Sequence, residues 1–316
     1  MSWIVDDPSL PSANATLIVA GGGARVFQSF DAGTQSYAPD AATKAVLART
    51  SATSYEQRFS DGSKEVFSTA TAVTGAGRKV FLTQRVDATG NAVGLTYDST
   101  YRLTAVTDTL GQVSTFTYNQ PGDPLKITRI TDPFGRTAQF AYDGASNLQQ
   151  ITDMIGLTSQ FSYTGSFINA LTTPYGTTIF AYGEVGAGTS TIRWLEATDP
   201  LGGKERLEYR HNAPGIAASD PAGTVPAGIS LINAYLNYRN SFFWDKKAMM
   251  EPTLDYTKAQ ITHWLHAEDG NAAAGVKESA KSPLENRVWY QYPNQPLPYD
   301  VGTSEQPIAR AQVLSD

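Results

Sequence analysis

Residues 108–118, Asp108-Thr-Leu-Gly111-Gln-Val-Ser-Thr-Phe116-Thr-Tyr118, contain the pattern that decides the fold. An aspartate precedes a glycine by three positions, and a tyrosine follows that glycine by seven. Successive aspartates from residue 87 to residue 153 lie 21, 24 and 21 residues apart, which indicates an internal repeat. The pairs are Asp87/Gly90, Asp108/Gly111, Asp132/Gly135, Asp153/Gly156 and Asp199/Gly202, and a sixth copy keeps Gly176 without the aspartate.

The first half of each copy predicts a tight turn. An aspartate at the first position of a type I turn can accept a hydrogen bond from the backbone two residues on, and a glycine at the fourth tolerates a positive φ. Pro133, Pro174 and Pro200 occupy the second position, where proline presets φ.

The second half of each copy predicts a strand with one aromatic face. Aromatic residues alternate there with Thr, Gln and Ala, so they share one side of the strand. The tyrosines are Tyr97, Tyr118, Tyr142, Tyr163, Tyr209 and, one residue early, Tyr182. Two positions before them stand Leu95, Phe116, Phe140, Phe161, Leu207 and Phe180.

The strand that enters each turn has apolar residues five and two positions before the aspartate, such as Leu103 and Val106. A spacing of three breaks strict alternation and suggests a β-bulge or an early strand end. Each copy is then one hairpin that cannot bury its face alone, and neighbours must stack. We therefore expect an all-β fold with little helix, in which stacked hairpins form a long curved sheet.

The motif Tyr97-Asp98-x-x-x-Arg102-Leu103-x-x-Val106-x-Asp108-x-x-Gly111 resembles the repeat of the Rhs/YD family. That family includes bacterial Rhs polymorphic toxins, the B and C components of insecticidal toxin complexes, and teneurins. This chain has Tyr101 and Ser146 where the family often has glycine. The resemblance implies a partial β-shell whose wall encloses a C-terminal toxin. The implied partners are the rest of a longer Rhs chain and its toxin passenger.

Three regions are predicted from the changes in pattern. Residues 1–77 are a β lead-in with a hairpin at 55–67, residues 78–210 are the hairpin array, and residues 211–316 are a non-repetitive β-rich extension. Within the extension we predict loops at 212–228 and 268–283, and long strands at 234–244 and 259–266.

Composition limits the partners and the compartment. A net charge of −6 argues against a nucleic acid or an anionic membrane surface. The chain has no cysteine, and no apolar run long enough to span a bilayer. Residues 15–20 are interpreted as a strand, because acidic Asp6 and Asp7 precede them where a signal peptide needs basic residues. We expect a protein that is cytoplasmic before export and then secreted or held at the cell surface, by a route without a recognisable signal peptide. Open sheet edges favour self-association.

No catalytic, cofactor-binding or metal site is predicted, so the chain is expected not to be an enzyme. His263 and His266 would point to opposite faces of a strand, and Asp132-Pro-x-Gly and Asp199-Pro-x-Gly fit the repeat as turns rather than as cleavage sites. The leading hypothesis is a structural wall segment of a toxin-enclosing shell. The alternative is a cell-surface module that binds glycan or protein, and its candidate ligand surface is Trp194, Trp244, Trp264 and Trp289.

Overall fold

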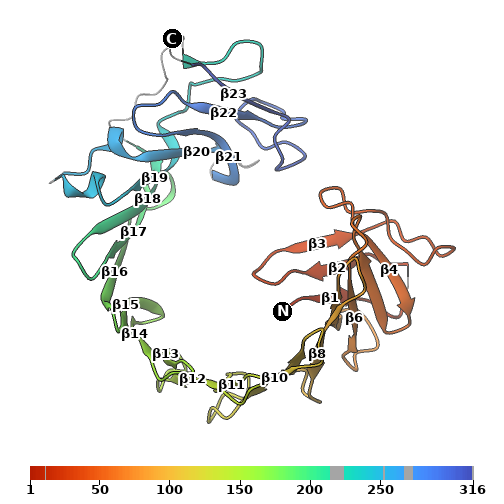
Figure 1. The fold of residues 1–316 in the computed structure, drawn as a ribbon. Helices are drawn as coiled ribbons and strands as arrows, with labels where there is room; N and C mark the ends of the chain where they lie inside the picture. Colours follow the sequence, from red (N-terminus) through yellow and green to blue (C-terminus); the bar gives the residue numbers. More distant parts are fainter. Residues whose placement is uncertain (11, 214–223, 252, 267–272, 315–316) are drawn as a thin grey trace. The chain divides into compact units, whose positions relative to one another are not determined.

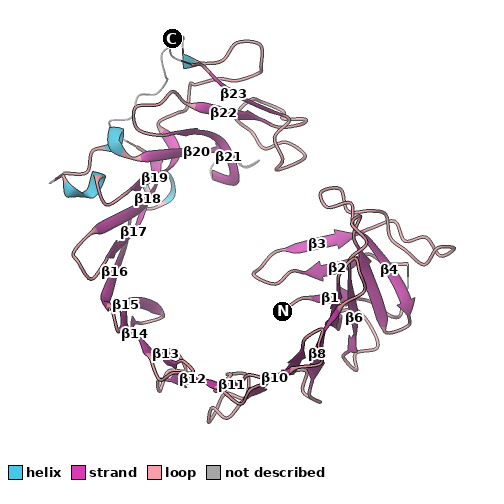
Figure 2. Cartoon of the chain, in the orientation of Figure 1, coloured by secondary structure: helices cyan, strands magenta, loops and turns pink. Residues whose placement is uncertain are grey.

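The fold is almost entirely antiparallel β-sheet, as the computed structural model of the chain shows (Figures 1 and 2). The structure describes residues 1–10, 12–213, 224–251, 253–266 and 273–314. Within these residues lie 23 strands and three short 3-10 helices, η1 (Gly188–Ser190), η3 (Ala248–Met250) and η4 (Tyr256–Lys258). They belong to two compact units, residues 1–158 and 159–316. The expected all-β fold of successive hairpins with little helix is confirmed.

Unit 1 contains thirteen whole strands, and from β4 to β13 each strand pairs antiparallel with the next. The strands are β1 (Trp3–Asp6), β2 (Ala15–Ile18), β3 (Ala24–Phe27), β4 (Val46–Ser51), β5 (Ser54–Arg58), β6 (Lys64–Ala70), β7 (Arg78–Val86), β8 (Ala92–Tyr97), β9 (Leu103–Thr107), β10 (Val113–Thr117), β11 (Arg129–Thr131), β12 (Thr137–Tyr142) and β13 (Leu148–Thr152). The hairpin expected at 55–67 is formed by β5 and β6.

Strand β7 joins the N-terminal strands to the repeat. Its first residues pair with β1, in the register Ile4↔Val80, and its last residues pair with β8, in the register Arg85↔Val93. Its other edge pairs with β6 along most of its length. One long strand therefore serves both the packed N-terminal part and the first repeat hairpin.

The core of unit 1 lies entirely in its N-terminal half. Its buried members are Ile4, Ala15, Leu17, Phe27, Tyr37, Leu47, Tyr55, Phe67, Val80 and Leu82. Beside it, the buried carboxylate of Asp6 accepts hydrogen bonds from Arg78 Nη2 and from the Tyr55 hydroxyl, both at 2.6 Å. Removing one partner of a buried ion pair typically costs about 3–5 kcal/mol. This network therefore fastens β1 to β5 and β7.

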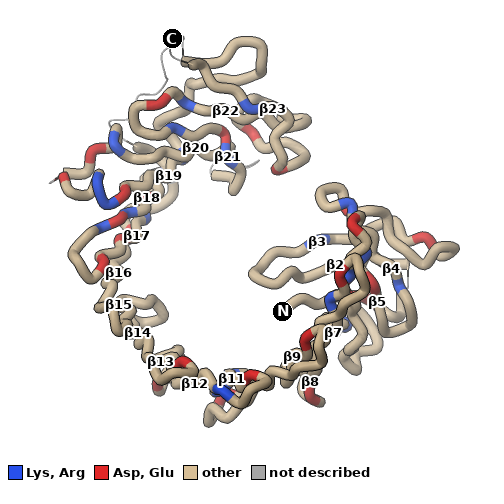
Figure 3. Tube along the Cα trace, viewed as in Figure 1, with Lys and Arg blue, Asp and Glu red and all other residues tan. Residues whose placement is uncertain are grey.

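The repeat array is a single layer of strands in the part of the chain that the structure describes. Among the described side chains from residue 83 to residue 207, none is buried. In unit 1, β8 to β13 leave the packed part as a single strip (Figure 1). Charged residues in the array are interspersed with uncharged runs, with no extended basic stretch (Figure 3).

In unit 2 each strand again pairs antiparallel with the next, from β14 with β15 to β22 with β23. Its buried cluster joins Ala213, Phe242, Trp244, Ala259 and Ile261, with Tyr256 packed against it. The strands are β14 (Thr158–Thr164), which begins at the last residue of unit 1, β15 (Phe167–Thr173), β16 (Gly176–Val185), β17 (Ile192–Thr198), β18 (Lys204–Asn212), β19 (Tyr238–Trp244), β20 (Gln260–His266), β21 (Ala273–Lys281), β22 (Val288–Gln291) and β23 (Ala309–Gln312).

The predicted features of residues 211–316 are met in part. The two long strands exist as β19 and β20, although β19 begins only at residue 238. The loop predicted at 268–283 is wrong over residues 273–281, because β21 pairs there with both β20 and β22. Its Ala, Gly, Lys and Ser residues carry no alternating apolar signal, so pairing with its neighbours makes it a strand. The loop predicted at 212–228 lies partly outside the described residues. The predicted limits at 77 and 210 stay a prediction, and the boundary between the two units falls inside the array.

Candidate functional site

The Asp-x-x-Gly turns share one hydrogen-bond pattern. At Asp108, the backbone carbonyl accepts from Gly111 N at 3.1 Å, and the backbone amide donates to Gln112 O at 2.9 Å. Oδ1 of the aspartate also accepts from Leu110 N at 2.9 Å and from Gln112 N at 2.8 Å. The glycine has a φ of 80°, which side chains rarely allow. The equivalent pattern occurs at Asp87, Asp132, Asp153 and Asp199.

The turn glycines Gly90, Gly156 and Gly202 lie at the exposed ends of their hairpins. Gly90, Gly156 and Gly202 have φ values of 84–93°, and each donates its amide to the carbonyl of its own turn aspartate at 3.0–3.2 Å. A Cβ added to any of these three would meet no atom within 4 Å, so the backbone conformation and not close packing favours glycine. Gly176, in the copy without aspartate, differs because a Cβ there would collide with Pro200. A structural role in the turn stays the prediction for these glycines.

The aspartates that follow the repeat tyrosines form the same turn at the opposite end of the hairpins. Asp98 O accepts from Tyr101 N at 3.0 Å, and Asp98 N donates to Arg102 O at 3.0 Å. Asp143 makes the equivalent turn with Ser146. Tyr101 and Ser146 have φ values of 64° and 63°, so non-glycine residues occupy the left-handed position here. Sequence reasoning saw the missing glycines but did not recognise this second turn.

The repeat tyrosines bond back across the hairpin. Three phenol hydroxyls each donate to a backbone carbonyl 15 residues earlier, with oxygen–oxygen distances of 2.6–2.7 Å. The acceptor is the residue five positions before the turn aspartate, in the pairs Tyr97–Leu82, Tyr118–Leu103 and Tyr142–Ile127. A buried or half-buried carbonyl needs such a donor. The tyrosine thus ties each outgoing strand to the incoming strand of its own hairpin.

The aromatic residues face apolar partners on the neighbouring strand. Phe116 lies opposite Ile130, Phe140 opposite Ile151, and Phe161 opposite Leu171. The expected bulge is present, because the register shifts just before Tyr97, Tyr142 and Tyr163. The shift returns the residue five before the aspartate to the aromatic face, where Leu103 lies opposite Tyr97 and Leu148 opposite Tyr142.

This aromatic face is only half covered. Phe116, Phe140, Phe161, Phe180 and the tyrosines other than Tyr182 are partly buried by neighbours in the same sheet, and Tyr182 is 56% exposed. Cross-strand aromatic and β-branched pairs stabilise a sheet by about 0.2–1 kcal/mol each. The array is therefore held by lateral pairing, and its aromatic face stays accessible.

A further copy of the repeat is present in the region predicted as non-repetitive. The hydroxyl of Tyr292 donates at 2.6 Å to Lys277 O, again 15 residues earlier. Ser282 stands where the turn aspartate would be, and Ala280↔Val288 repeats the register of Val106↔Ser114 around Asp108. Leu284, rather than the fourth turn residue, has the positive φ, of 65°. The sequence signal for this copy is the ten-residue spacing from Ser282 to Tyr292, the same as from Asp108 to Tyr118. It was missed because serine replaces the turn aspartate and glutamate replaces the turn glycine.

The third position of five turns holds a large apolar residue that is 71–96% exposed. A single exposed apolar residue is ordinary, but the same position is exposed in successive turns. The residues are Leu110, Phe134 and Ile155 in unit 1, and Tyr175 and Leu201 in unit 2. We name them the turn-tip residues. Sequence reasoning did not single them out, because turn residues at that position have no required chemistry.

The four tryptophans do not form one surface. Trp244 and Trp289 are completely buried, so their place in the candidate ligand surface is wrong. Trp244 packs on Phe242 and Tyr256 in the core of unit 2, and its indole donates to Asp255 O at 2.9 Å. Trp264 is partly buried and donates to Ser241 Oγ at 2.8 Å.

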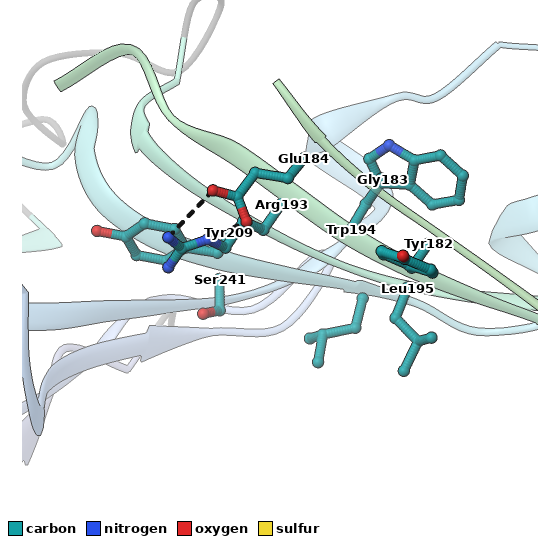
Figure 4. A pocket seen from close by; sticks show the side chains of 9 residues that line it. Tyr182, Gly183, Glu184, Arg193, Trp194, Leu195, Tyr209 and Ser241 are labelled. Carbon is teal, nitrogen blue, oxygen red and sulfur yellow. Dashed lines mark hydrogen bonds and ion pairs between the residues drawn. The ribbon is translucent and has the colours of Figure 1, made fainter. Parts of the chain in front are cut away.

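Trp194 borders a pocket of about 270 Å³ on the sheet of unit 2 (Figure 4). The pocket is lined by Tyr182, Gly183, Glu184, Arg193, Trp194, Leu195, Leu207, Tyr209 and Ser241. The indole of Trp194 lies over Gly183 and points away from Leu195, the next residue in the strand (Figure 4). Arg193 and Glu184 form an exposed ion pair at 2.9 Å, a kind of pair that contributes little. The pocket holds no nucleophile paired with a base.

The histidines and acidic residues of the described ranges were the other candidates for a metal site. His263 is buried and His266 partly exposed, and no group of three or more His, Asp or Glu in the described part of the chain could hold a metal ion. No helix within those residues has the length and apolar character that crossing a membrane requires.

Residues 125–154 match the family model described as the RHS repeat. They contain β11 to β13, the turns at Asp132 and Asp143, and the hydroxyl bond from Tyr142 to Ile127. The chain thus contains an RHS repeat at residues 125–154. The copies before it share its Asp-x-x-Gly turn and its tyrosine hydrogen bond, and the copies at Asp153 and Asp199 share the turn.

Solved structures with some likeness to this chain are toxin complexes. One is TcdB2-TccC3 without its hypervariable C-terminal region, with 11% identity and a TM-score of 0.37. Another is TcdB2-TccC3-Cdc42, with 13% identity and a TM-score of 0.27, and a third is the Photorhabdus luminescens Tc holotoxin pore, with 10% identity and a TM-score of 0.23. They cover 88–89% of this chain, which spans only 17–18% of theirs. Curated protein sequences give no match.

Proposed function

We propose that this chain is a structural, non-enzymatic segment of a longer RHS-repeat protein, and that it supplies wall strands to a β-shell. The shell would enclose a C-terminal toxin or effector used in bacterial competition or virulence, and the protein would act after export from the producing cell. The observation that carries the proposal is the single-layered array with its half-exposed aromatic face.

A wall of this kind needs two different faces. Along β16, Tyr182 presents an exposed aromatic side chain on one face, whereas Ala181 and Gly183 occupy the other. An unfolded passenger exposes apolar side chains that can pack on such an aromatic face. The array also has low local burial, so its stability comes from neighbouring strands and not from a core.

The turn-tip residues support assembly into a larger body. Five large apolar side chains at the ends of hairpins are costly in water unless another protein surface covers them. The remainder of a longer chain would supply that surface.

The alternative of a cell-surface module that binds glycan or protein has less support, because two of its four tryptophans, Trp244 and Trp289, are completely buried. Of the remaining two, Trp194 lies on the opposite face of the sheet from the exposed ring of Tyr182.

The first test is binding of a fluorescently labelled unfolded polypeptide, such as reduced and carboxymethylated lactalbumin, followed by anisotropy. We expect saturable binding that Tyr182→Thr weakens several-fold. Ala181→Thr, on the opposite face of the same strand, is the matched control and should leave binding unchanged. No binding, or equal loss in both variants, would contradict the proposal.

The second test concerns the turn-tip residues. We expect the chain to self-associate in sedimentation velocity, and the triple variant Leu110→Ser, Phe134→Ser, Ile155→Ser to reduce this. Leu125→Ser is a control, because Leu125 is 71% exposed but lies in the turn at Asp123, which connects β10 to β11 and is not one of the Asp-x-x-Gly turns. Identical sedimentation of triple variant and control would refute a role for the tips in association.

A further inference from the structure

The sheet of unit 2 has a polar patch on its buried side, where β19, β20 and β21 lie next to one another. His263 of β20 is 1% exposed and pairs with Asn240 of β19 and Ser279 of β21, which are both completely buried. Arg239 and Glu278, the chain neighbours of these two partners, are 4% and 2% exposed. Burying charged groups costs free energy that a purely apolar core would not require.

Two irregularities of the backbone direct the charged side chains inward. Side chains of a regular strand alternate between its faces, yet β19 and β21 each bury two successive residues. In β21 the cause is a bulge, because the pairing with β20 shifts beside His263 and leaves Glu278 as the extra residue. In β19, Arg239 has a φ of 54°, a left-handed conformation that is strained for a residue with a side chain. Strain of this kind is concentrated at functional sites.

Glu278 faces His263 and Arg239 at the same time. Its Oε2 lies 3.4 Å from Nδ1 of His263 and 3.7 Å from Nη2 of Arg239. None of these three atoms makes a well-formed hydrogen bond within the described residues. A protonated carboxyl group can donate to Nδ1 of a neutral histidine, so one hydrogen would give two of these atoms a partner. The geometry suits a carboxyl group that keeps its proton.

The surrounding charges set how many protons the patch holds. Arg239 from β19 and Arg287 before β22 act on His263, and the segment before β19 presents the backbone of Tyr235 to it. Burial, together with the two arginines, holds the pKa of His263 well below its usual range. Burial also raises the pKa of Glu278 to about 8, although the two arginines oppose that shift. At pH 7 the histidine and the glutamate together therefore hold one titratable proton, on Glu278.

We propose that Glu278 and His263 form a proton-controlled lock in the core of unit 2. One proton held between them keeps β20 packed against β21, and its loss at mildly alkaline pH loosens both strands. The lock is separate from the aromatic face of the array and does not depend on the wall function.

The sign of the pH dependence follows from the two states of Glu278. In the unfolded chain its carboxyl loses the proton near pH 4.5, whereas the folded patch keeps it up to about pH 8. The stability that this proton contributes is complete below pH 4.5 and is lost as the pH rises toward 8. His263 acts in the opposite sense, but only below its unfolded value of 6.5. The range above pH 7 therefore reports on Glu278.

The test is hydrogen exchange of the full chain between pH 7 and pH 8.5, corrected for the intrinsic pH dependence of exchange. We expect the opening of β19, β20 and β21 to increase roughly eightfold across this range. Strands β6 and β7 of unit 1 should show no such increase. Glu278→Gln should remove the increase, whereas Glu285→Gln, at an exposed position after β21, is the matched control and should keep it.

Infrared spectroscopy of the unaltered chain gives a second reading, because Glu278→Gln can fail to fold. The carbonyl stretch of a protonated carboxyl group is distinct from the bands of a carboxylate, and exposed carboxyl groups are ionised at pH 7. We expect a band from one protonated carboxyl group at pH 7 that disappears by pH 9. Absence of this band, opening of β20 and β21 that is independent of pH, or an equal increase in the parent chain and Glu278→Gln would overturn the proposal.

Discussion

Replacing Tyr97 with phenylalanine should destabilise the first repeat hairpin and its junction with the core of unit 1. The hydroxyl donates to Leu82 O at 2.6 Å, and Leu82 is only 2% exposed. The ring of Tyr97 packs on Phe81, so phenylalanine preserves that packing and removes only the hydrogen bond. The carbonyl of a buried residue then loses its side-chain donor.

The expected loss follows from the burial of the acceptor. An ordinary intramolecular hydrogen bond contributes about 1 kcal/mol, and leaving a buried acceptor unsatisfied costs about 1–3 kcal/mol. We therefore expect Tyr97→Phe to lower the free energy of unfolding by about 1–2 kcal/mol. Tyr118→Phe should cost less, about 0.5–1 kcal/mol, because its acceptor Leu103 is only partly buried and water can replace the hydroxyl.

The assay is urea unfolding followed by circular dichroism, together with hydrogen exchange of peptides from residues 78–107. Tyr182→Phe is the matched control, because Tyr182 is 56% exposed, and its loss should stay within about 0.5 kcal/mol. Faster exchange should be confined to the peptides around Leu82 and Tyr97. If Tyr97→Phe is no more destabilising than Tyr182→Phe, the hydroxyl bond does not stabilise the repeat.

The pKa of Tyr97 offers an independent check. Burial, together with the nearby Tyr118, raises that pKa to about 12. Because the folded value lies above the unfolded value of about 10, its contribution to stability is complete below pH 10. That contribution is lost as the pH rises toward 12, so alkaline unfolding of Tyr97→Phe should be less steep than that of the parent chain.

Three further predictions concern turns and close packing. Gly135→Val should lower the free energy of unfolding by at least about 1 kcal/mol, because the φ of 81° is strained for valine; an unchanged urea midpoint would contradict the turn geometry. Gly183→Ala should cost about 1–3 kcal/mol and shift the tryptophan emission, because a Cβ there collides with the indole of Trp194. Gly275→Ala is its control in an open site of β21, and equal effects would rule out the collision. Hydrogen bonds from the side chains of Asn91 and Thr89 lower the pKa of Asp87 to about 2, so its contribution is present above its unfolded value near pH 4 and lost as the pH falls toward 2. Asp87→Asn should remove part of the acid dependence of unfolding, and an identical acid titration by circular dichroism would refute this.

Most of the array could be predicted from the sequence because its determinants are local. The Asp108–Gly111 turn is closed by residues within four positions of each other, and the aromatic face follows from a period of two. The bulge before Tyr97 was also foreseen, since residues three apart can share a face of a strand only if the register shifts.

Other features could not be predicted from the sequence, because they depend on contacts with residues far away in the chain. β21 has no alternating apolar pattern and becomes a strand through pairing with β20 and β22. Trp289 looked available for a ligand because nothing local marks a residue for burial. The copy at Ser282 keeps only the spacing to Tyr292, and its hydrogen bond is what identifies it.

The sequence by itself determined that this protein is built from repeated β-hairpins, because turn chemistry and strand alternation act over a few residues. Only the tertiary structure decided which apolar side chains stay uncovered, how β7 is shared between the N-terminal core and the first repeat, and that Trp289 is completely buried. Burial depends on contacts between residues far apart in the chain, and a local sequence pattern cannot predict such contacts.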